Sequence, residues 1–169
     1  VIYMKKTLIV IDMQNDFIDG SLGTAEAVKI VPNVRKKIEE YRSNGDEIIF
    51  TRDTHGEDYL STPEGKKLSV VHCVKNTHGW QIADGLDVPD AIHIDKPSFG
   101  YTHWDKFCFE KVELVGLCTD ICVVSNALIL KALFPNAEIS VDSACCAGVT
   151  PETHNSALAT MKMCQIDVV

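Results

Sequence analysis

The sequence predicts an α/β fold in which helices cover both faces of a central, mostly parallel sheet. Short apolar runs alternate along the chain with stretches whose apolar residues recur at helical spacing. The first apolar run, residues 7–12, is continuous, which is typical of a strand buried on both faces. Alternating strands and helices favour parallel pairing through right-handed crossovers, with helices on both sides of the sheet.

The predicted elements follow in order from residue 7 to the end of the chain. Strands are predicted at residues 7–12, 47–51, 91–95, 112–117, 137–141 and 166–169. Helices are predicted at residues 26–44, 119–133 and 151–163. Gly45 is placed to end the first helix. Thr150 is the expected N-cap of the last one, because a threonine hydroxyl accepts hydrogen bonds from helix N–H groups.

Residues 53–89 do not follow this alternation. The segment is long and carries many polar residues, histidines and glycines. Long irregular insertions in compact domains are usually functional or disordered. We therefore expect this segment to cover a site.

Length and charge restrict the class of protein. A chain of 169 residues fits one domain, 1–169, and is long enough to bury a core. The net charge of −8 argues against a nucleic-acid partner. No apolar run approaches the ~20 residues that a membrane-spanning helix needs, so no membrane partner is expected. Met4 is the expected natural start, with residues 1–3 an upstream extension and no secretory signal.

The seven cysteines do not resemble the framework of a small secreted domain, because their number is odd and two are adjacent. Reduced thiols in a cytoplasmic protein are the simpler interpretation. Most buried cysteines act as small apolar residues, so a catalytic one has to be identified by its position. The adjacent pair Cys145 and Cys146 is expected to be structural.

Three reactive side chains follow strands that are predicted to end at the same edge of the sheet. Asp12 ends the first strand, Lys96 follows the third, and Cys122 lies in the turn after the fourth. Ligands of open parallel sheets bind at the carboxyl ends of the strands. A helix N-terminus and a nearby lysine would favour the thiolate of Cys122, and Asp12 could carry its proton. The backbone N–H groups of residues 117–122 could hold an oxyanion.

Each of these residues, taken alone, has an ordinary structural explanation. An aspartate after a strand is commonly a turn or cap residue, and a lysine there is commonly a solvated charge. A cysteine in the first turn of a helix is commonly a packing residue. Only their joint placement at one edge of the sheet indicates acyl transfer through a thioester.

Several motifs, in order along the chain, resemble those of the nicotinamidase/isochorismatase-like cysteine hydrolases. Residues 12–17, D-M-Q-N-D-F, resemble the opening motif of that family, and residues 115–123, V-G-L-C-T-D-I-C-V, resemble its nucleophile segment. Lys96 matches the position of the family's catalytic lysine. Residues 142–145 and 150–154 resemble its C-terminal signature.

The resemblance implies a three-layer α/β/α sandwich, the isochorismatase-like hydrolase fold, and a homo-oligomer. It makes Asp12, Lys96 and Cys122 the catalytic triad. It also places a non-proline cis peptide between Leu117 and Cys118, which turns the Cys118 N–H toward the oxyanion beside that of Cys122. Cys118 stands where alanine is usual in the family, and we interpret it as a small packing residue.

The resemblance further implies a divalent metal beside the triad. Asp53 and His55 form the family's D-x-H pair, and His72 is the later histidine. Residues two apart in an extended segment point the same way, so Asp53 and His55 can share an ion. Two imidazoles and a carboxylate suit zinc first, with manganese or iron as alternatives. The other interpretation is that Asp53 and His55 only order the loop.

Two positions depart from the nicotinamidase pattern. Tyr59 stands where many nicotinamidases have another histidine, and the tryptophan often found shortly before the later histidine is missing from residues 68–71. That tryptophan would stack on a pyridine ring. The departures leave the identity of the amide open.

The aromatic residues Phe17, Phe99 and Tyr101 flank Asp12 and Lys96 in sequence and are expected to line the substrate pocket, or else to be core or rim residues. The function expected from the resemblance is hydrolysis of a small amide, most specifically of nicotinamide to nicotinate and ammonia. A carbamoyl or ureido compound is an alternative substrate. Isochorismatase itself lacks the cysteine, so Cys122 argues against that reaction. A non-catalytic scaffold on the same fold is the alternative of another class.

Overall fold

The computed structural model describes the backbone of residues 1–169 and all side chains except those of residues 3 and 4. Six strands form one sheet in the order β3-β2-β1-β4-β5-β6. These strands are β1 (Ile2–Ile11), β2 (Glu47–Asp53), β3 (Ile92–Lys96), β4 (Phe107–Leu117), β5 (Glu138–Ala147) and β6 (Asp167–Val168). Every strand pairing in the described part of the chain is parallel.

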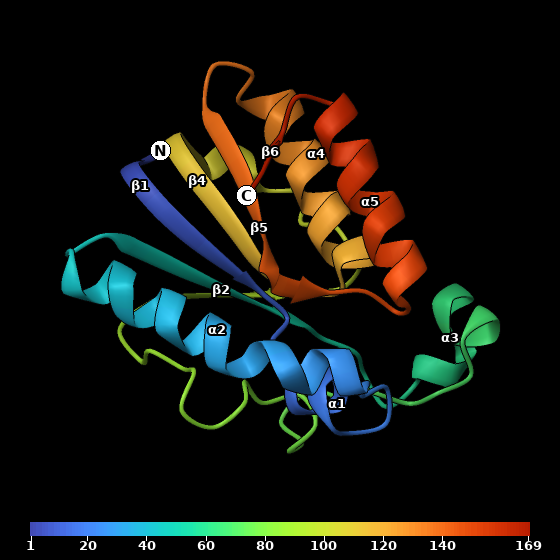
Figure 1. Ribbon diagram of the computed structural model, residues 1–169. Coiled ribbons are helices and arrows are strands. Elements are labelled where there is room, and N and C mark those ends of the chain that lie inside the picture. The colour runs from blue at the N-terminus through green and yellow to red at the C-terminus, as the bar shows by residue number, and fades with distance from the viewer.

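Helices lie on both sides of this sheet, as Figure 1 shows. The long helix α2 covers one face, and α4 and α5 cover the other. The α-helices are α1 (Asn15–Ile18), α2 (Ala25–Ser43), α3 (Pro63–Lys67), α4 (Val124–Leu133) and α5 (Pro151–Met163). Short 3-10 turns, η1 (Tyr59–Ser61) and η2 (Trp104–Lys106), and a π-helical turn, η3 (Thr119–Val123), join them. The predicted three-layer α/β/α sandwich is confirmed.

The central strand β1 explains why a continuous apolar run marks a two-sided sheet. Leu8 and Val10 pack into the core beneath α2, whereas Ile9 and Ile11 pack into the core beneath α4 and α5. All four side chains are fully buried. Successive side chains of a strand point to opposite faces, so a strand covered on both sides needs apolar residues at every position.

Four strands, β1, β2, β4 and β5, are longer than the sequence predicted, whereas β3 is shifted by one residue and β6 is shorter. β1, β4 and β5 extend beyond the predicted runs, and Lys96 is the last residue of β3 rather than the residue after it. The first half of β4 carries exposed Glu110 and Lys111, because the sheet extends there past its covering helices. Because these strand ends carry polar residues, the apolar pattern of the sequence did not reveal them. The register between β4 and β5 shifts between residues 114 and 116 of β4. Beyond this shift β5 continues through residues for which the sequence predicted no strand.

The predicted helix at residues 119–133 begins with the π-helical turn η3 and becomes regular α-helix only at α4. The helix predicted at residues 151–163 has those bounds in α5, and Thr150 is its N-cap as predicted. Gly45, at φ +71°, ends the chain's longest helix, where glycine adopts a left-handed backbone without strain.

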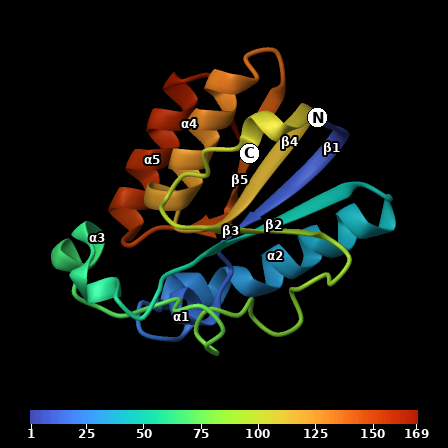
Figure 2. The same cartoon turned by 180° about the vertical axis from the view of Figure 1, so that it is seen from behind.

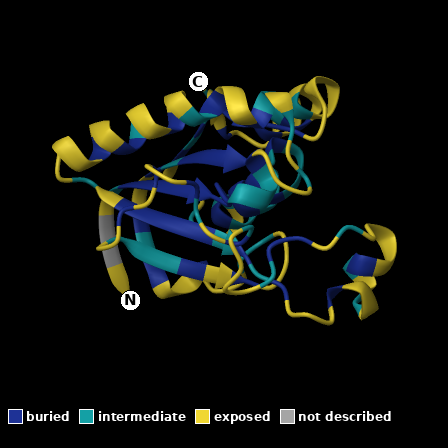
Figure 3. Ribbon diagram, turned by 90° about the horizontal axis from the view of Figure 1, so that it is seen from below, coloured by how far each residue is buried: buried dark blue, intermediate teal, exposed yellow. Residues whose placement is uncertain are grey.

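The insertion between β2 and β3 contains only η1 and α3 as regular structure. Figure 1 shows α3 standing at the edge of the molecule, away from the sheet, and Figure 3 shows exposed surface over much of it. Figure 2, from behind, shows the chain after α3 looping along the side of the molecule where β3 lies. In the described part of the chain, no helix combines the length and the apolar character needed to cross a membrane.

Candidate active site and metal centre

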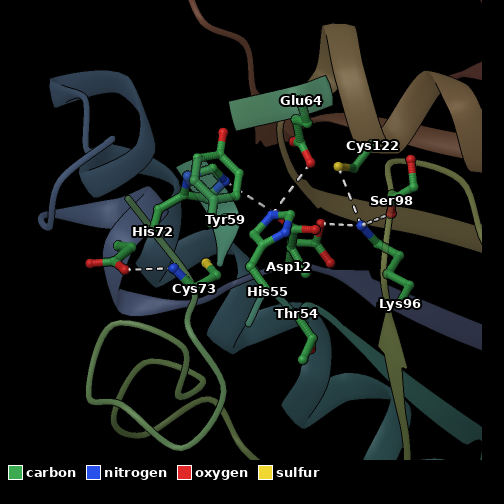
Figure 4. Close-up of polar contacts among 12 residues, drawn as sticks. Asp12, Thr54, His55, Tyr59, Glu64, His72, Cys73, Lys96, Ser98 and Cys122 are labelled. Carbon is green, nitrogen blue, oxygen red and sulfur yellow. Dashed lines mark hydrogen bonds and ion pairs between the residues drawn. The ribbon is translucent and has the colours of Figure 1, made fainter. Parts of the chain in front are cut away.

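The predicted triad residues meet at the carboxyl edge of the sheet, as Figure 4 shows. Lys96 Nζ lies 2.6 Å from Oδ2 of Asp12 and donates to Sγ of Cys122 at 3.4 Å. It also donates to the carbonyl of Ser98 at 3.2 Å. The lysine therefore bridges a carboxylate and a thiol that are 110 residues apart in sequence (122 − 12). The sheet brings them together because their strands β1, β3 and β4 are parallel and end at one edge.

This corner is shut off from solvent. The exposed fractions are 0% for Asp12, 0% for Lys96 and 4% for Cys122. Thr51, on the neighbouring strand β2, donates its hydroxyl to Oδ1 of Asp12 at 2.7 Å. The backbone of Asp12 lies in the left-handed region at φ 48°, an uncommon conformation for a non-glycine residue that clusters at functional sites.

The electrostatics of the corner follow from burial. Burial raises the pKa of Asp12, and the adjacent ammonium of Lys96 only partly opposes this shift. For Lys96, burial lowers the pKa, but the charge of Asp12 and the hydrogen bond to it outweigh this effect, so the pKa is raised and the ammonium persists. Asp12 is thus a better proton acceptor than an ordinary aspartate, held beside a permanent cation.

The thiol behaves differently from the sequence-based expectation. Burial, together with the negative charge of Asp12, raises the pKa of Cys122 well above its ordinary value, although Lys96 works to lower it. Desolvation of the anion therefore opposes the thiolate that the lysine and the helix end were expected to favour.

The turn that carries Cys122 has an unusual backbone. The peptide between Leu117 and Cys118 is cis, as expected from the family resemblance. The carbonyl of Cys118 then accepts from the N–H groups of Ile121 and Val123 at 3.1 and 3.0 Å. Gly116 precedes the turn at φ +121°, and a Cβ there would lie 2.1 Å from the carbonyl oxygen of Ile11, so only glycine fits.

Cys118, the other cysteine of this turn, also lines the cavity. Burial and the charge of Asp120 raise the pKa of its thiol to about 12. Its side chain forms part of the cavity wall, in agreement with the interpretation of Cys118 as a small packing residue.

Four possible metal ligands converge next to the triad. The ligand atoms of Asp53, His55, Glu64 and His72 all lie within 4.8 Å of one another. Oδ2 of Asp53 lies 2.9 Å from Nε2 of His55 and 3.4 Å from Nε2 of His72, and Glu64 Oε2 lies 3.6 Å from the His55 nitrogen. The structure therefore brings the three predicted ligands together. It adds Glu64, which sequence spacing could not reveal because the carboxylate arrives on the separate helix α3.

The cluster fits a divalent cation. Oδ1 of Asp53 is buried and has no hydrogen-bond partner, which an ion would satisfy. His72 Nδ1 donates to the carbonyl of Val70 at 2.7 Å, which orients Nε2 toward the cluster, 3.4 Å from Oδ2 of Asp53. Burial raises the pKa of Asp53, but hydrogen bonds from His55 and His72 outweigh it and lower the pKa, so its carboxylate stays charged.

Tyr59 does not replace the additional histidine as a ligand. Its ring packs edge-on against the imidazoles of His55 and His72, with centroids at 4.6 and 4.8 Å. Its hydroxyl donates to the carbonyl of Leu68 at 2.8 Å. Tyr59 therefore supports two of the candidate ligands from behind, while Glu64 adds the fourth donor.

A cavity of about 310 Å³ opens between the triad and this cluster. Its wall includes Phe17 and Phe99, as predicted. Tyr101 was wrongly assigned to the pocket: its ring packs into the core against Trp104, at a centroid distance of 5.0 Å. The remaining lining residues are Leu22, Thr24, Ala27, Asp53, Glu64, Leu68, His72, Cys118, Ile121, Cys122 and Val149. The surface of this wall is mostly apolar, and its aliphatic residues come from segments that sequence patterns do not mark.

Similarity to a protein family and to solved structures agrees with this geometry. Residues 6–169 match the isochorismatase domain. The chain belongs to the isochorismatase family. A pyrazinamidase of Pyrococcus horikoshii, solved in complex with zinc, has a similar fold, with a TM-score of 0.83 and 30% sequence identity. That match covers 97% of this chain and 98% of the other.

Two curated relatives bear on function. A nicotinamidase of Saccharomyces cerevisiae is 26% identical over 97% of this chain and 99% of its own length. A probable inactive nicotinamidase of Arabidopsis thaliana is 31% identical over 92% of this chain and 87% of its own length. Membership of the family is therefore compatible with both active and inactive chains, and the site decides which applies.

The opening motif of this isochorismatase-family chain links the two centres. Gln14 Nε2 donates to the carbonyls of Asp53 and Trp80, and its Oε1 accepts the Asp53 N–H, each at 2.8 Å. Asp16 accepts the N–H of Cys73 at 2.8 Å. Sequence patterns predicted roles for the first and last residues of the motif, Asp12 and Phe17, but not for the polar residues between them. Those polar residues tie the histidine-bearing loop to the end of β1.

Proposed function

We propose that this protein is a cysteine-dependent amidohydrolase of small amides, most specifically one that converts nicotinamide to nicotinate and ammonia. The observation that carries the proposal is the bridge of Lys96 between Asp12 and Cys122, buried at the base of a largely apolar cavity. Relatives named nicotinamidase and pyrazinamidase support the substrate class.

In the first half-reaction, the Cys122 thiol gives its proton to the Asp12 carboxylate as sulfur attacks the amide carbonyl. The adjacent ammonium of Lys96 stabilises the sulfur anion as it forms. The N–H groups of Cys118 and Cys122 would hold the oxygen of the tetrahedral intermediate, as the family resemblance implies. The raised pKa of Asp12 suits it to take this proton.

The intermediate then collapses by breaking the C–N bond. Asp12 returns the proton to the departing nitrogen, ammonia leaves, and the acyl group stays on Cys122 as a thioester. Asp12, again a carboxylate, deprotonates a water that attacks the thioester. The carbon–sulfur bond breaks, the carboxylic acid is released and Cys122 recovers its proton.

Asp53, His55, Glu64 and His72 are the residues that would hold a divalent metal, zinc first and manganese or iron as alternatives. Such an ion, when bound, supplies a Lewis-acid contact for a ring nitrogen of the substrate. The cavity wall includes atoms of Asp53 and His72 as well as Cys122, so one small ligand can contact both centres. Phe17 and Leu68 would pack against the ring of the amide, with Leu68 in the region where relatives use an aromatic side chain.

The test is ammonia release from a panel of nicotinamide, pyrazinamide and carbamoyl compounds, with metal analysis of the purified protein. We expect turnover of at least one pyridine- or pyrazine-type amide. Cys122→Ala should reduce it to background, because no other lining residue offers an activated nucleophile, while the circular dichroism spectrum stays unchanged. Full activity of Cys122→Ala would overturn the cysteine mechanism. Turnover of carbamoyl compounds alone would assign the alternative substrate, and no turnover on any amide would favour the scaffold.

The proposal includes three further expectations from the sequence. The protein forms one domain over residues 1–169, assembles as a homo-oligomer, and works in the cytoplasm, where its seven free thiols stay reduced.

A further inference from the structure

The turn that carries Cys122 is held by hydrogen bonds to the corner where β5 leads into α5. Thr119 lies three residues before Cys122 and is fully buried. Its Oγ1 is 2.6 Å from Nδ1 of His154, near the start of α5. Because a buried hydroxyl requires a hydrogen-bond partner, this contact holds the side chain of Thr119 in its orientation.

The same corner also holds the next residue of the turn. Both carboxylate oxygens of Asp120 accept the backbone N–H of Val149, at 3.2 and 3.1 Å. Val149 is at the same time part of the cavity wall. The corner therefore forms hydrogen bonds with two consecutive residues of the turn, Thr119 and Asp120, and also lines the substrate cavity.

The position of His154 is set by its own helix. Thr150 and Thr153 form a reciprocal capping box, and Pro151 occupies the first turn of α5. Gly148 lets the incoming strand pass close to the helix, because a Cβ there would lie 2.9 Å from Cβ of His154. This capped helix start therefore holds the imidazole of His154 next to Thr119. Burial lowers the pKa of His154, against the opposing charge of Asp120, so a neutral ring faces the hydroxyl near neutral pH.

We propose that His154 is a positioning residue for the reaction. Through Thr119 Oγ1 it fixes the peptide between Cys118 and Thr119, and thereby aims the N–H groups that receive the oxyanion and the sulfur of Cys122. His154 does not line the cavity, so its effect falls on the transition state rather than on substrate binding. This inference rests on the proposed amidohydrolase function.

The test compares His154→Ala, Thr119→Val, the double variant and His154→Asn. Removing either partner should lower kcat about tenfold, because a slightly misplaced catalytic group slows the reaction even when substrate binding is intact. KM should stay within about twofold of the wild-type value. The double variant should be no slower than the single ones, because both remove one contact. His154→Asn should recover most of the rate, because its amide can occupy the place of Nδ1. The matched control is His93→Ala, which removes a half-buried histidine bonded to Asp87 at 2.6 Å outside the cavity and should keep kcat.

A second readout needs no substrate. Alkylation of Cys122 by iodoacetamide, measured by peptide mass and referred to exposed Cys164, should change by one common factor in His154→Ala, Thr119→Val and the double variant. An unchanged kcat and alkylation rate in His154→Ala, or effects that multiply in the double variant, would overturn the positioning role. If His154→Ala does not fold, Thr119→Val and His154→Asn decide. Absence of hydrolysis in the wild type contradicts the proposed function alone, since the alkylation result still tests the positioning.

Discussion

The two centres at the carboxyl edge of the sheet are built in different ways. Asp12 and Lys96 are placed by strands whose register is fixed by parallel ladders, such as Ile11 opposite Thr51 and Asp53 opposite Lys96, and Cys122 follows β4 in the turn η3. In the metal-ligand cluster only Asp53 lies on a ladder of the sheet. The other ligands lie on an insertion that is held by isolated bridges, such as His55 with Val74, and by single side chains such as that of Asp16.

This difference teaches which part of the site depends on the fold and which depends on single contacts. Ladders hold Asp12 and Lys96 through many backbone hydrogen bonds, so replacing one of these side chains should remove chemistry but leave the geometry intact. Isolated bridges and single side-chain hydrogen bonds hold the insertion with the metal ligands, so a substitution some distance away should loosen them. Three substitutions separate these cases, from the largest expected effect to the smallest.

Replacing Asp12 should have the largest effect and should stay confined to the triad. We expect Asp12→Asn to lower turnover by about 10³-fold, within the range of general acid–base contributions. Asp12 raises the pKa of Cys122, so removing its charge lowers that pKa and increases the thiolate fraction at neutral pH. Alkylation of Cys122 should therefore become faster while hydrolysis is lost.

The measurements for Asp12→Asn are steady-state kinetics, a pH profile of alkylation and metal content. Asp95→Asn is the matched control, because it removes a carboxylate one residue from Lys96 that pairs instead with Arg52 at 2.7 Å. Slower alkylation in Asp12→Asn, or loss of its metal, would contradict the separation of the two centres.

Replacing Glu64 should weaken the metal centre while leaving the thiol unaltered. We expect Glu64→Gln to reduce zinc affinity about 100-fold, because it removes a charged donor from the cluster. Competition with a chromogenic chelator measures the affinity. Glu57→Gln, which changes an exposed glutamate of the same insertion, should match the wild type. Equal zinc affinity in both variants would remove Glu64 from the ligand set.

Replacing Asp16 should have the smallest effect, because its carboxylate holds the loop and not the ion. Asp16→Ala removes the acceptor of the Cys73 N–H, next to His72, and should lower zinc affinity about tenfold. Asp19→Ala, an exposed aspartate nearby, serves as the control. The same chelator competition measures the zinc affinity of both variants. If Asp16→Ala binds zinc as tightly as the wild type, the loop is held by other contacts and the comparison between the centres weakens.

The sequence could predict the fold and the triad because both depend on regular patterns. Apolar runs marked the strands, and reactive residues after three of those runs had to meet once the strands paired in parallel. The metal ligands Asp53, His55 and His72 came from the family resemblance, and the structure brings them together.

What the sequence could not predict depends on tertiary contacts. Glu64 approaches the cluster only because α3 folds back over it, and no spacing in the chain encodes that approach. Tyr101 was misplaced because closeness to Lys96 in sequence does not fix the direction of a side chain. The direction of the Cys122 pKa shift was misjudged because the depth of burial, which a helix end cannot offset, is a property of the folded chain.

The apolar wall of the cavity has a consequence for the direction of catalysis. None of its described lining residues is lysine or arginine, whereas Asp53 and Glu64 contribute carboxylates. The amide of the proposed reaction is neutral, but the acid that it becomes is an anion at neutral pH. An anion is desolvated at high cost in such apolar surroundings. The pocket therefore discriminates between reactant and product by charge, and ionisation of the product promotes its own release.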